Sequence, residues 1–235
     1  MAANFARMPS LRISELFASL QGEGVSAGAP ATFLRLGDCN LSCTYCDTPY
    51  SWDWQRYERK SELTEEDVLV TAARVRALSP RRMVITGGEP LLQQPALERL
   101  TGELAEFFTE VETNGTLMPS ELLRARIGQW NVSPKLASSG ASLLQRRKTS
   151  VLETFRDTER AWLKFVISEP SDVNEARDLV AAVGWPKERV LLMPEARTPE
   201  ELAERSPNVA KAALDCGYRF STRLHVMLWG DTRGR

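Results

Sequence analysis

Three of the four cysteines, Cys39, Cys43 and Cys46, lie close together, and the fourth, Cys216, stands alone near the other end of the chain. In a reducing compartment such a cluster is more often a metal or redox site than a set of disulfides, because thiolates are available there as ligands. The spacing therefore predicts a metal centre.

Two kinds of metal centre fit these residues. A structural zinc ion needs four ligands in a closed tetrahedron, so Cys216 or the only histidine, His225, would have to complete the set. An iron-sulfur cluster bound by only three thiolates leaves one iron open to an external ligand, which makes it a place for chemistry.

Further polar clusters follow apolar segments that predict strands. These clusters are Gly87-Gly88-Glu89-Pro90, Glu112-Thr113-Asn114, Ser133 with Lys135, and Met193-Pro194-Glu195. Ligands of parallel α/β proteins bind at the carboxyl ends of the strands, so we expect the clusters to meet at one site. Glycines allow close approach of a ligand, and carbonyls beside a carboxylate suit an ammonium group.

The elements that must position these residues alternate along the chain. Apolar segments predict strands over residues 31–36, 83–88, 109–115, 131–134, 163–168, 190–196 and 220–228. Helical spacing predicts helices over residues 61–78, 95–107, 119–126, 172–183 and 199–217, the first capped by Ser61 or Thr64.

About six parallel strands with helices outside fit either an open doubly wound sheet or an incomplete barrel of the TIM type. Eight full units need about 250 residues, so the incomplete barrel is the better fit. We expect a single domain over residues 1–235. The least patterned stretch, residues 135–160, is predicted to be a mobile surface connection, with the Arg146, Arg147 and Lys148 triplet solvated.

Composition excludes several classes of protein. With 43% hydrophobic residues in 235 the chain has enough apolar side chains for a core, which excludes intrinsic disorder. Lys and Arg number 30 against 31 Asp and Glu, so no basic excess favours nucleic acid or anionic lipid. No stretch reaches the roughly 20 apolar residues of a membrane span, and the first residues lack a secretory core, so we expect a cytoplasmic protein.

Taken together, the motifs carry a family resemblance. The Cys39-x3-Cys43-x2-Cys46 spacing with Tyr45 before the last cysteine, followed by the GGEP segment, resembles the radical S-adenosylmethionine (SAM) superfamily. Five further segments are similar to the 7-carboxy-7-deazaguanine synthases of queuosine biosynthesis: LQGEG at 20–24, Asp47-Thr48, ETNG at 112–115, SPK at 133–135 and the tail at 224–230.

The resemblance implies a radical SAM core and a lyase reaction. Cys39, Cys43 and Cys46 would ligate a 4Fe-4S cluster whose open iron binds SAM. A radical made from SAM would remove hydrogen from C6 of 6-carboxy-5,6,7,8-tetrahydropterin, and ring contraction with loss of ammonia would give 7-carboxy-7-deazaguanine. The protein's share would be to position the reacting carbons and to exclude water.

The resemblance also implies roles for other residues. Thr48 would bind a magnesium ion, which prefers oxygen ligands. The substrate would be held by Leu20, Gln21, Gly22, Arg35 and Thr86. SAM would be held by Gly88, Glu89, Thr113, Ser133, Lys135, Met193, Pro194 and Glu195, with Glu89 taking its ammonium group.

Partners follow from the same resemblance, and two alternatives stay open. The implied electron donor is a flavodoxin or ferredoxin, and the implied assembly is a homodimer. The alternatives are another small radical SAM enzyme, such as a glycyl-radical activating enzyme, and a structural zinc-binding module. We interpret His225 as a packing residue and Cys216 as a small core residue.

Overall fold

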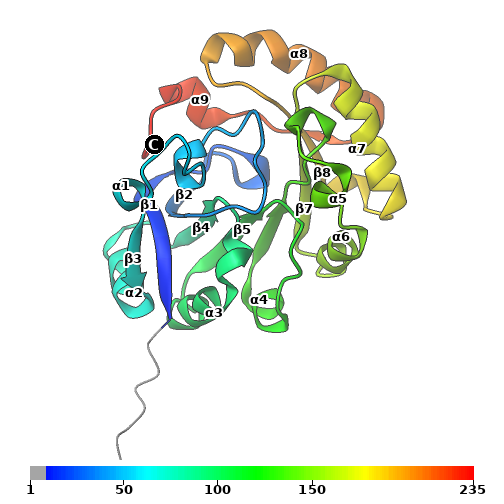
Figure 1. Cartoon of the computed structure of the whole chain (residues 1–235). Helices are drawn as coiled ribbons and strands as arrows, with labels where there is room; N and C mark the ends of the chain where they lie inside the picture. The colour runs from blue at the N-terminus through cyan, green and yellow to red at the C-terminus, as the bar shows by residue number, and fades with distance from the viewer. Residues whose placement is uncertain (1–8) are drawn as a thin grey trace, which may run out of the picture.

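Seven parallel strands form most of one sheet in this computed structural model, which describes residues 9–235 (Figure 1). They are β2 (Pro30–Leu36), β4 (Arg82–Gly87), β5 (Phe108–Thr113), β6 (Gln129–Val132), β7 (Ala161–Ile167), β8 (Val190–Pro194) and β9 (Arg219–Phe220). Two antiparallel strands, β1 (Ser10–Leu20) and β3 (Thr64–Asp67), extend the sheet beyond β2.

The order of the strands identifies the architecture as an incomplete barrel. The order is β3-β1-β2-β4-β5-β6-β7-β8-β9, so each parallel strand lies beside the parallel strand that follows it in the chain. A doubly wound sheet would reverse this order at a switch point, and none occurs among the described strands. The predicted incomplete barrel is therefore confirmed, with β3 and β9 at its edges.

Helices connect the parallel strands and lie around the outside of the sheet (Figure 1). The connecting helices are α2 (Val68–Ala77), α3 (Gln94–Glu103), α4 (Glu121–Arg126), α5 (Leu143–Arg146), α6 (Thr149–Arg156), α7 (Pro170–Ala182) and α8 (Pro199–Cys216). Two further helices are short: α1 (Arg59–Glu62) precedes β3, and α9 (Leu224–Trp229) follows β9. None of the helices in residues 9–235 is both long and apolar enough to cross a membrane.

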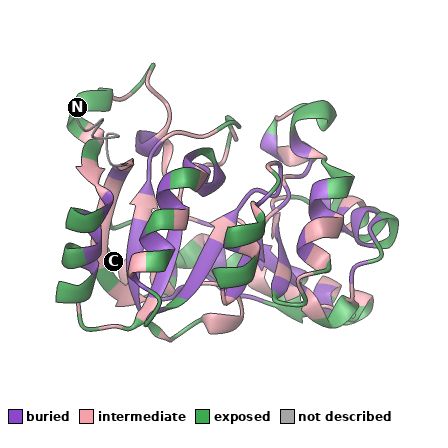
Figure 2. Ribbon diagram, turned by 90° about the horizontal axis from the view of Figure 1, so that it is seen from below, coloured by how far each residue is buried: buried purple, intermediate pink, exposed green. Residues whose placement is uncertain are grey.

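The strands bury apolar side chains outward and turn polar side chains inward. Successive residues of a strand point to opposite faces, so one face packs on the helices while the other faces the barrel interior. Residues of the outer, helix-covered core include Leu34, Ile85, Val111, Trp130 and Leu163. Their neighbours Arg35, Thr86, Glu112, Asn131 and Lys164 line an interior pocket. The strands are accordingly the most buried part of the molecule (Figure 2).

The open side of the barrel is bridged by the loop after β1 and the segment that leads into α9 (Figure 1). The Leu224 N–H donates to the Gly22 carbonyl at 2.8 Å, and the Gly24 N–H donates to Ser221 Oγ at 2.8 Å. A Cβ on Gly22 would lie 2.0 Å from Nδ1 of His225, so only glycine fits this contact.

Two predicted elements are wrong because distant pairing overrides the local pattern. The helix predicted over 61–78 begins only at Val68, since residues 64–67 pair with β1 as the edge strand β3. Its cap is Asp67, whose carboxylate accepts the Leu69 N–H at 2.7 Å. The strand predicted over 220–228 is instead the two-residue β9 followed by α9, whose Val226 packs with Ala196 and Leu202.

The prediction for residues 135–160 is wrong in part, although Lys148 is exposed as expected. The stretch forms α5 and α6, and Arg146 is only 8% exposed rather than solvated. Its guanidinium pairs with the Glu175 carboxylate and donates to the carbonyls of Lys135 and Ala141. The structure describes no residue before 9, so the predicted absence of a secretory core in residues 1–8 lies outside the described residues.

We expect Phe155→Ala to lower the free energy of unfolding by about 3–5 kcal/mol, because it empties a core position. The Phe155 ring is fully buried on α6 and packs edge-on against Trp130 at 5.0 Å between ring centroids. The matched control is Leu144→Ala in the same stretch, 83% exposed, which should change the value by less than about 0.5 kcal/mol. Urea unfolding of both variants measures this, and equal values would contradict the packing of α6.

Candidate functional site

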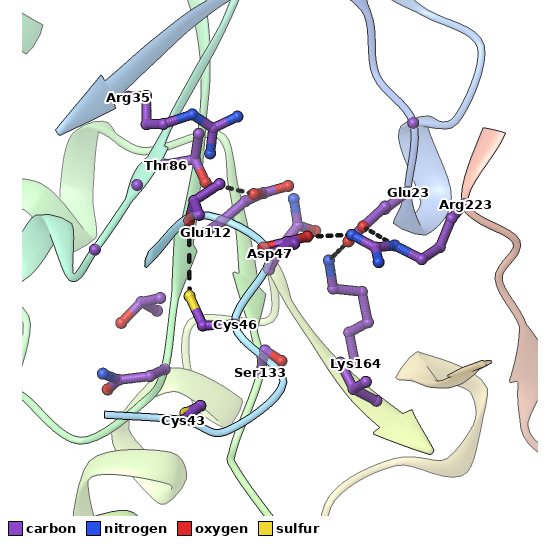
Figure 3. Close-up of a pocket in the computed structure, with 18 of the residues that line it drawn as sticks. Glu23, Arg35, Cys43, Cys46, Asp47, Thr86, Glu112, Ser133, Lys164 and Arg223 are labelled. Atoms are coloured by element: carbon purple, nitrogen blue, oxygen red, sulfur yellow. Dashed lines mark hydrogen bonds and ion pairs between the residues drawn. The ribbon is translucent and has the colours of Figure 1, made fainter. Parts of the chain in front are cut away.

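A cavity of about 220 Å³ opens at the carboxyl ends of the parallel strands (Figure 3). Fifteen of the seventeen site residues that the sequence predicts line this cavity. The cysteine loop contributes Cys39, Cys43, Cys46 and Thr48, and the loop after β1 with the inner strand faces contributes Leu20, Gln21, Gly22, Arg35 and Thr86. The other strand ends contribute Gly88, Thr113, Ser133, Lys135, Met193 and Glu195.

The cysteine loop is held against the end of β4 by its backbone. A Cβ on Gly88 would lie 2.0 Å from the Asp38 carbonyl oxygen, so the loop approaches as closely as it does only because residue 88 is glycine. The same carbonyl accepts the Glu89 N–H at 2.8 Å. The Asp38 carboxylate accepts from Trp54 Nε1 at 3.1 Å and pairs with Arg12. These contacts fix the start of the loop.

The three thiols of this loop are free and share a poorly solvated environment. Burial raises the pKa of Cys39 to about 12, although the Leu41 N–H opposes the shift, and Glu89, Cys43 and Cys46 raise it further. Burial also raises the pKa of Cys43. Thiolates gathered here therefore need a positive partner, which the irons of a cluster supply. The donor set thus fits a cluster.

Lys135 brings a positive charge to the same wall. Burial alone would lower its pKa, but Tyr45 and the three cysteines raise it, so the ammonium group stays charged. Its Nζ donates to Ser133 Oγ at 3.2 Å. A cation beside the cysteines suits an anionic ligand group.

Four charged side chains form an ionic network on the other side of the cavity (Figure 3). Glu23 pairs with Lys164 and accepts from Arg223 Nε at 2.9 Å, and Arg223 also pairs with Asp47. Burial alone would raise the pKa of Glu23, but Lys164, Arg223 and His225 together lower it well below its usual range. The sequence analysis missed Lys164 and Arg223. A lysine in the apolar strand at 163–168 was the available signal, whereas Arg223 was hidden in a wrongly predicted strand.

Glu112 gathers two of the predicted substrate residues. Its carboxylate accepts from Thr86 Oγ1 at 2.7 Å and from Gln21 Nε2 at 3.2 Å. Arg35 also lines the cavity, but its Nε donates to Glu15 at 2.7 Å. Part of the guanidinium is therefore already engaged.

Glu89 and Pro194, unlike the other predicted SAM-binding residues, are not among the residues that line the cavity. Glu89 is fully buried, and its carboxylate accepts from the Asn114 N–H at 2.8 Å, the Leu91 N–H at 3.0 Å and Thr113 Oγ1 at 2.9 Å. Such a carboxylate orders the ends of β4 and β5 instead of facing a ligand. Pro194 is buried at the end of β8.

The two remaining candidates also differ from expectation. His225 lines the cavity rather than only packing, and its Nε2 lies 4.0 Å from Glu23 Oε1. Cys216 is half-buried at the end of α8, away from the residues that line the cavity. Within residues 9–235 no three His, Cys, Asp or Glu side chains are gathered closely enough to hold one metal ion.

Comparisons with known proteins agree with this geometry. Residues 35–159 match the model of the Radical SAM superfamily. The chain is 40% identical over 229 residues to a 7-carboxy-7-deazaguanine synthase of Pyrobaculum aerophilum, covering 97% of this chain and 98% of the relative. It is 37% identical over 254 residues to the synthase of Halobacterium salinarum, covering 98% and 95%.

A solved structure supports the fold. The crystal structure of QueE from Escherichia coli superposes with a TM-score of 0.69 at 24% identity, covering 92% of this chain and 95% of that one. The superfamily match favours a cluster over a structural zinc ion at the three cysteines.

We expect Glu23→Gln to flatten the loss of stability in acid. The lowered pKa of Glu23 means that the unfolded chain takes up a proton below about pH 5 while the folded chain does not. Stability therefore falls as the pH is lowered. Without this carboxylate the fall should be shallower. Urea unfolding of the apo chain between about pH 6 and pH 4 measures the slope.

Glu204→Gln is the matched control, because Glu204 is exposed on α8. Its slope should follow that of the unaltered chain. Equal slopes for all three proteins would show that the ionic network does not lower the pKa of Glu23.

Proposed function

Because this chain belongs to the 7-carboxy-7-deazaguanine synthase family of radical SAM enzymes, we propose that it converts 6-carboxy-5,6,7,8-tetrahydropterin to 7-carboxy-7-deazaguanine with loss of ammonia. The observation that carries the proposal is one cavity in which three free thiols face the polar ends of the parallel strands. The product places the enzyme in 7-deazapurine synthesis, of which queuosine formation is the example.

Cys39, Cys43 and Cys46 would hold the 4Fe-4S cluster that the family requires. When bound, the cluster and SAM supply the one-electron chemistry that removes a hydrogen atom from the substrate. The residues of this chain bind and orient the reactants and keep water out, which is the usual share of the protein in cofactor chemistry.

We infer that SAM is held along the strand ends beside the cysteines. Its anionic carboxylate suits the Lys135 ammonium, and its polar groups suit Ser133 and Thr113. Gly88 lines the cavity with its backbone, which suits a contact between a carbonyl oxygen and the ammonium group of SAM. Met193 and Glu195 would complete this wall. Glu89 would not touch SAM but would hold the Thr113 side chain in place by accepting its hydrogen bond.

The pterin would lie toward the loop after β1. Gln21 offers both a donor and an acceptor, and the nearby Glu112 carboxylate accepts from N–H groups of a pterin ring. Arg35 and Lys164 bring positive charge that suits the substrate carboxylate. Leu20, Gly22 and Thr86 would complete the contact surface.

We infer that Thr48 supplies a hydroxyl ligand to a magnesium ion. Thr48 lines the cavity, and its Oγ1 lies 3.8 Å from Cys46 Sγ. Mg²⁺ binds oxygen and usually keeps several waters, so one protein hydroxyl with the substrate carboxylate is a sufficient set. The carboxylate of Asp47 lies next to it in the chain.

The remaining expectations concern the setting of the reaction. We infer that the chain is one domain, since a single sheet runs through the described residues, and that it acts in the cytoplasm. We infer electron supply by a flavodoxin or ferredoxin. A homodimer is supported by the exposed apolar side chains near the C-terminal end, Leu214, Phe220, Met227 and Leu228.

The deciding experiment is an anaerobic assay of the cluster-reconstituted protein with SAM, reductant, magnesium and the carboxytetrahydropterin. Mass spectrometry should detect 5′-deoxyadenosine and 7-carboxy-7-deazaguanine together. Formation of 5′-deoxyadenosine alone would overturn the substrate, and a colourless zinc protein without either product would overturn the enzyme.

We expect Cys43→Ala to lose the cluster and all cleavage of SAM, because the thiolate is one of only three protein ligands. Iron content and 5′-deoxyadenosine formation measure both effects. Cys216→Ala, a change outside the cavity, should keep both. A Cys43→Ala protein with a full cluster and normal turnover would remove the ligand assignment.

We expect Thr48→Ala to weaken the magnesium dependence of product formation while the iron content stays normal. The control is Thr44→Ala in the same loop, whose hydroxyl is exposed and donates to the Ser138 carbonyl. Titration of magnesium in the product assay distinguishes the two. An unchanged dependence in Thr48→Ala would leave Thr48 only a turn residue before Pro49.

A further inference from the structure

The Trp52 indole reaches the sulfur of a cluster ligand. Its Nε1–H donates to Cys46 Sγ at 3.2 Å, which is a short distance for a hydrogen bond to sulfur. The short helical turn Pro49–Ser51 presents the ring, and the Trp52 N–H donates to the Pro49 carbonyl at 3.1 Å. The contact is therefore built by local backbone structure rather than by a long flexible side chain.

Cys46 differs from the other two cysteines in how it is held. Within residues 9–235, Cys39 Sγ accepts only from the Leu41 backbone N–H, at the longer distance of 3.4 Å. The carbonyl of Cys46 accepts from the Arg197 guanidinium, so this residue is held at its backbone as well as at its sulfur. Trp52 thus acts on a ligand whose position is already fixed.

Trp52 and Cys46 border the same two hollows. Both residues line the interior cavity and a second hollow to which Arg56, Tyr57 and Arg197 also contribute. Cys46 is only partly exposed, and a hydrogen bond is electrostatically stronger where water is scarce.

We propose that Trp52 sets the reduction potential of the cluster by donating its indole N–H to the Cys46 thiolate. The inference rests on the proposed function only in taking the three cysteines as cluster ligands. On reduction the cluster accepts one electron from an external one-electron donor, and no bond is made or broken. The reduced cluster has more negative sulfur atoms, so the N–H stabilises it more than the oxidised cluster and raises the potential.

The test is a redox titration of the reconstituted holoenzyme without SAM, followed by electron paramagnetic resonance. Trp52→Phe keeps an aromatic ring and removes the N–H. At the midpoint potential of the unaltered protein we expect about tenfold less reduced cluster relative to oxidised cluster, a size typical of one hydrogen bond to a charged group. This corresponds to a fall of 59 mV for a one-electron couple.

Trp162→Phe is the control, since Trp162 lies on β7 against the Arg219 guanidinium and lines neither hollow beside the cysteine loop. Its midpoint should stay at the unaltered value. A Trp52→Phe midpoint equal to that of the unaltered protein, or an equal fall in both variants, would overturn the inference. An unaltered protein that takes up no iron would instead overturn the proposed function.

A second variant keeps the test decisive if the Trp52→Phe protein does not bind its cluster. Replacing Trp52 by 3-benzothienylalanine keeps the shape of the indole and exchanges the N–H for sulfur. The fall in potential should reappear in this protein. In deuterated solvent the unaltered holoenzyme should show an exchangeable deuteron coupled to the cluster that this replacement removes, and its persistence would overturn the inference.

Discussion

Charge buried inside the incomplete barrel is the constraint on which the rest of the structure depends. The Glu23 carboxylate is almost enclosed, and an unpaired charge there would cost several kcal/mol. Lys164 from β7 and Arg223 from the segment before α9 supply the pairing. Because the three residues come from distant parts of the chain, satisfying one carboxylate holds the loop after β1, the barrel wall and the C-terminal segment together.

The same constraint explains how one set of strands serves both core and site. Outward side chains such as Trp130 and Phe165 pack on the helices, whereas their neighbours Asn131 and Lys164 face inward. A shift of one residue in register would exchange these two faces. The packing of the outer core therefore also fixes which polar groups the cavity receives.

The cysteine loop is ordered by polar contacts rather than by an apolar core. The close backbone approach at Gly88 and the hydrogen bonds of Asp38 fix its start, and Trp52 and Arg197 fix its end at Cys46. Such a loop can keep its sulfur atoms directed at the cavity while its other face stays close to solvent. This arrangement suits a site that must receive both a bound ligand and an electron.

The sequence by itself determined what is local or periodic. The alternation of apolar segments predicted β2 and the strands from β4 to β8, and the cysteine spacing predicted a metal centre at the end of β2. The rule that ligands bind at strand ends predicted that Gly88, Thr113 and Ser133 meet, and all three line the cavity.

Only the tertiary structure decided which distant groups meet. Lys164 and Arg223 lie 141 and 200 residues from Glu23 in the chain, so no local pattern encodes their pairing. Residues 64–67 form a strand because they pair with β1. The Glu89 carboxylate is buried because Thr113 and Asn114 donate hydrogen bonds to it. Buried polar groups must find partners wherever the fold supplies them, and that requirement is met in space, not in sequence.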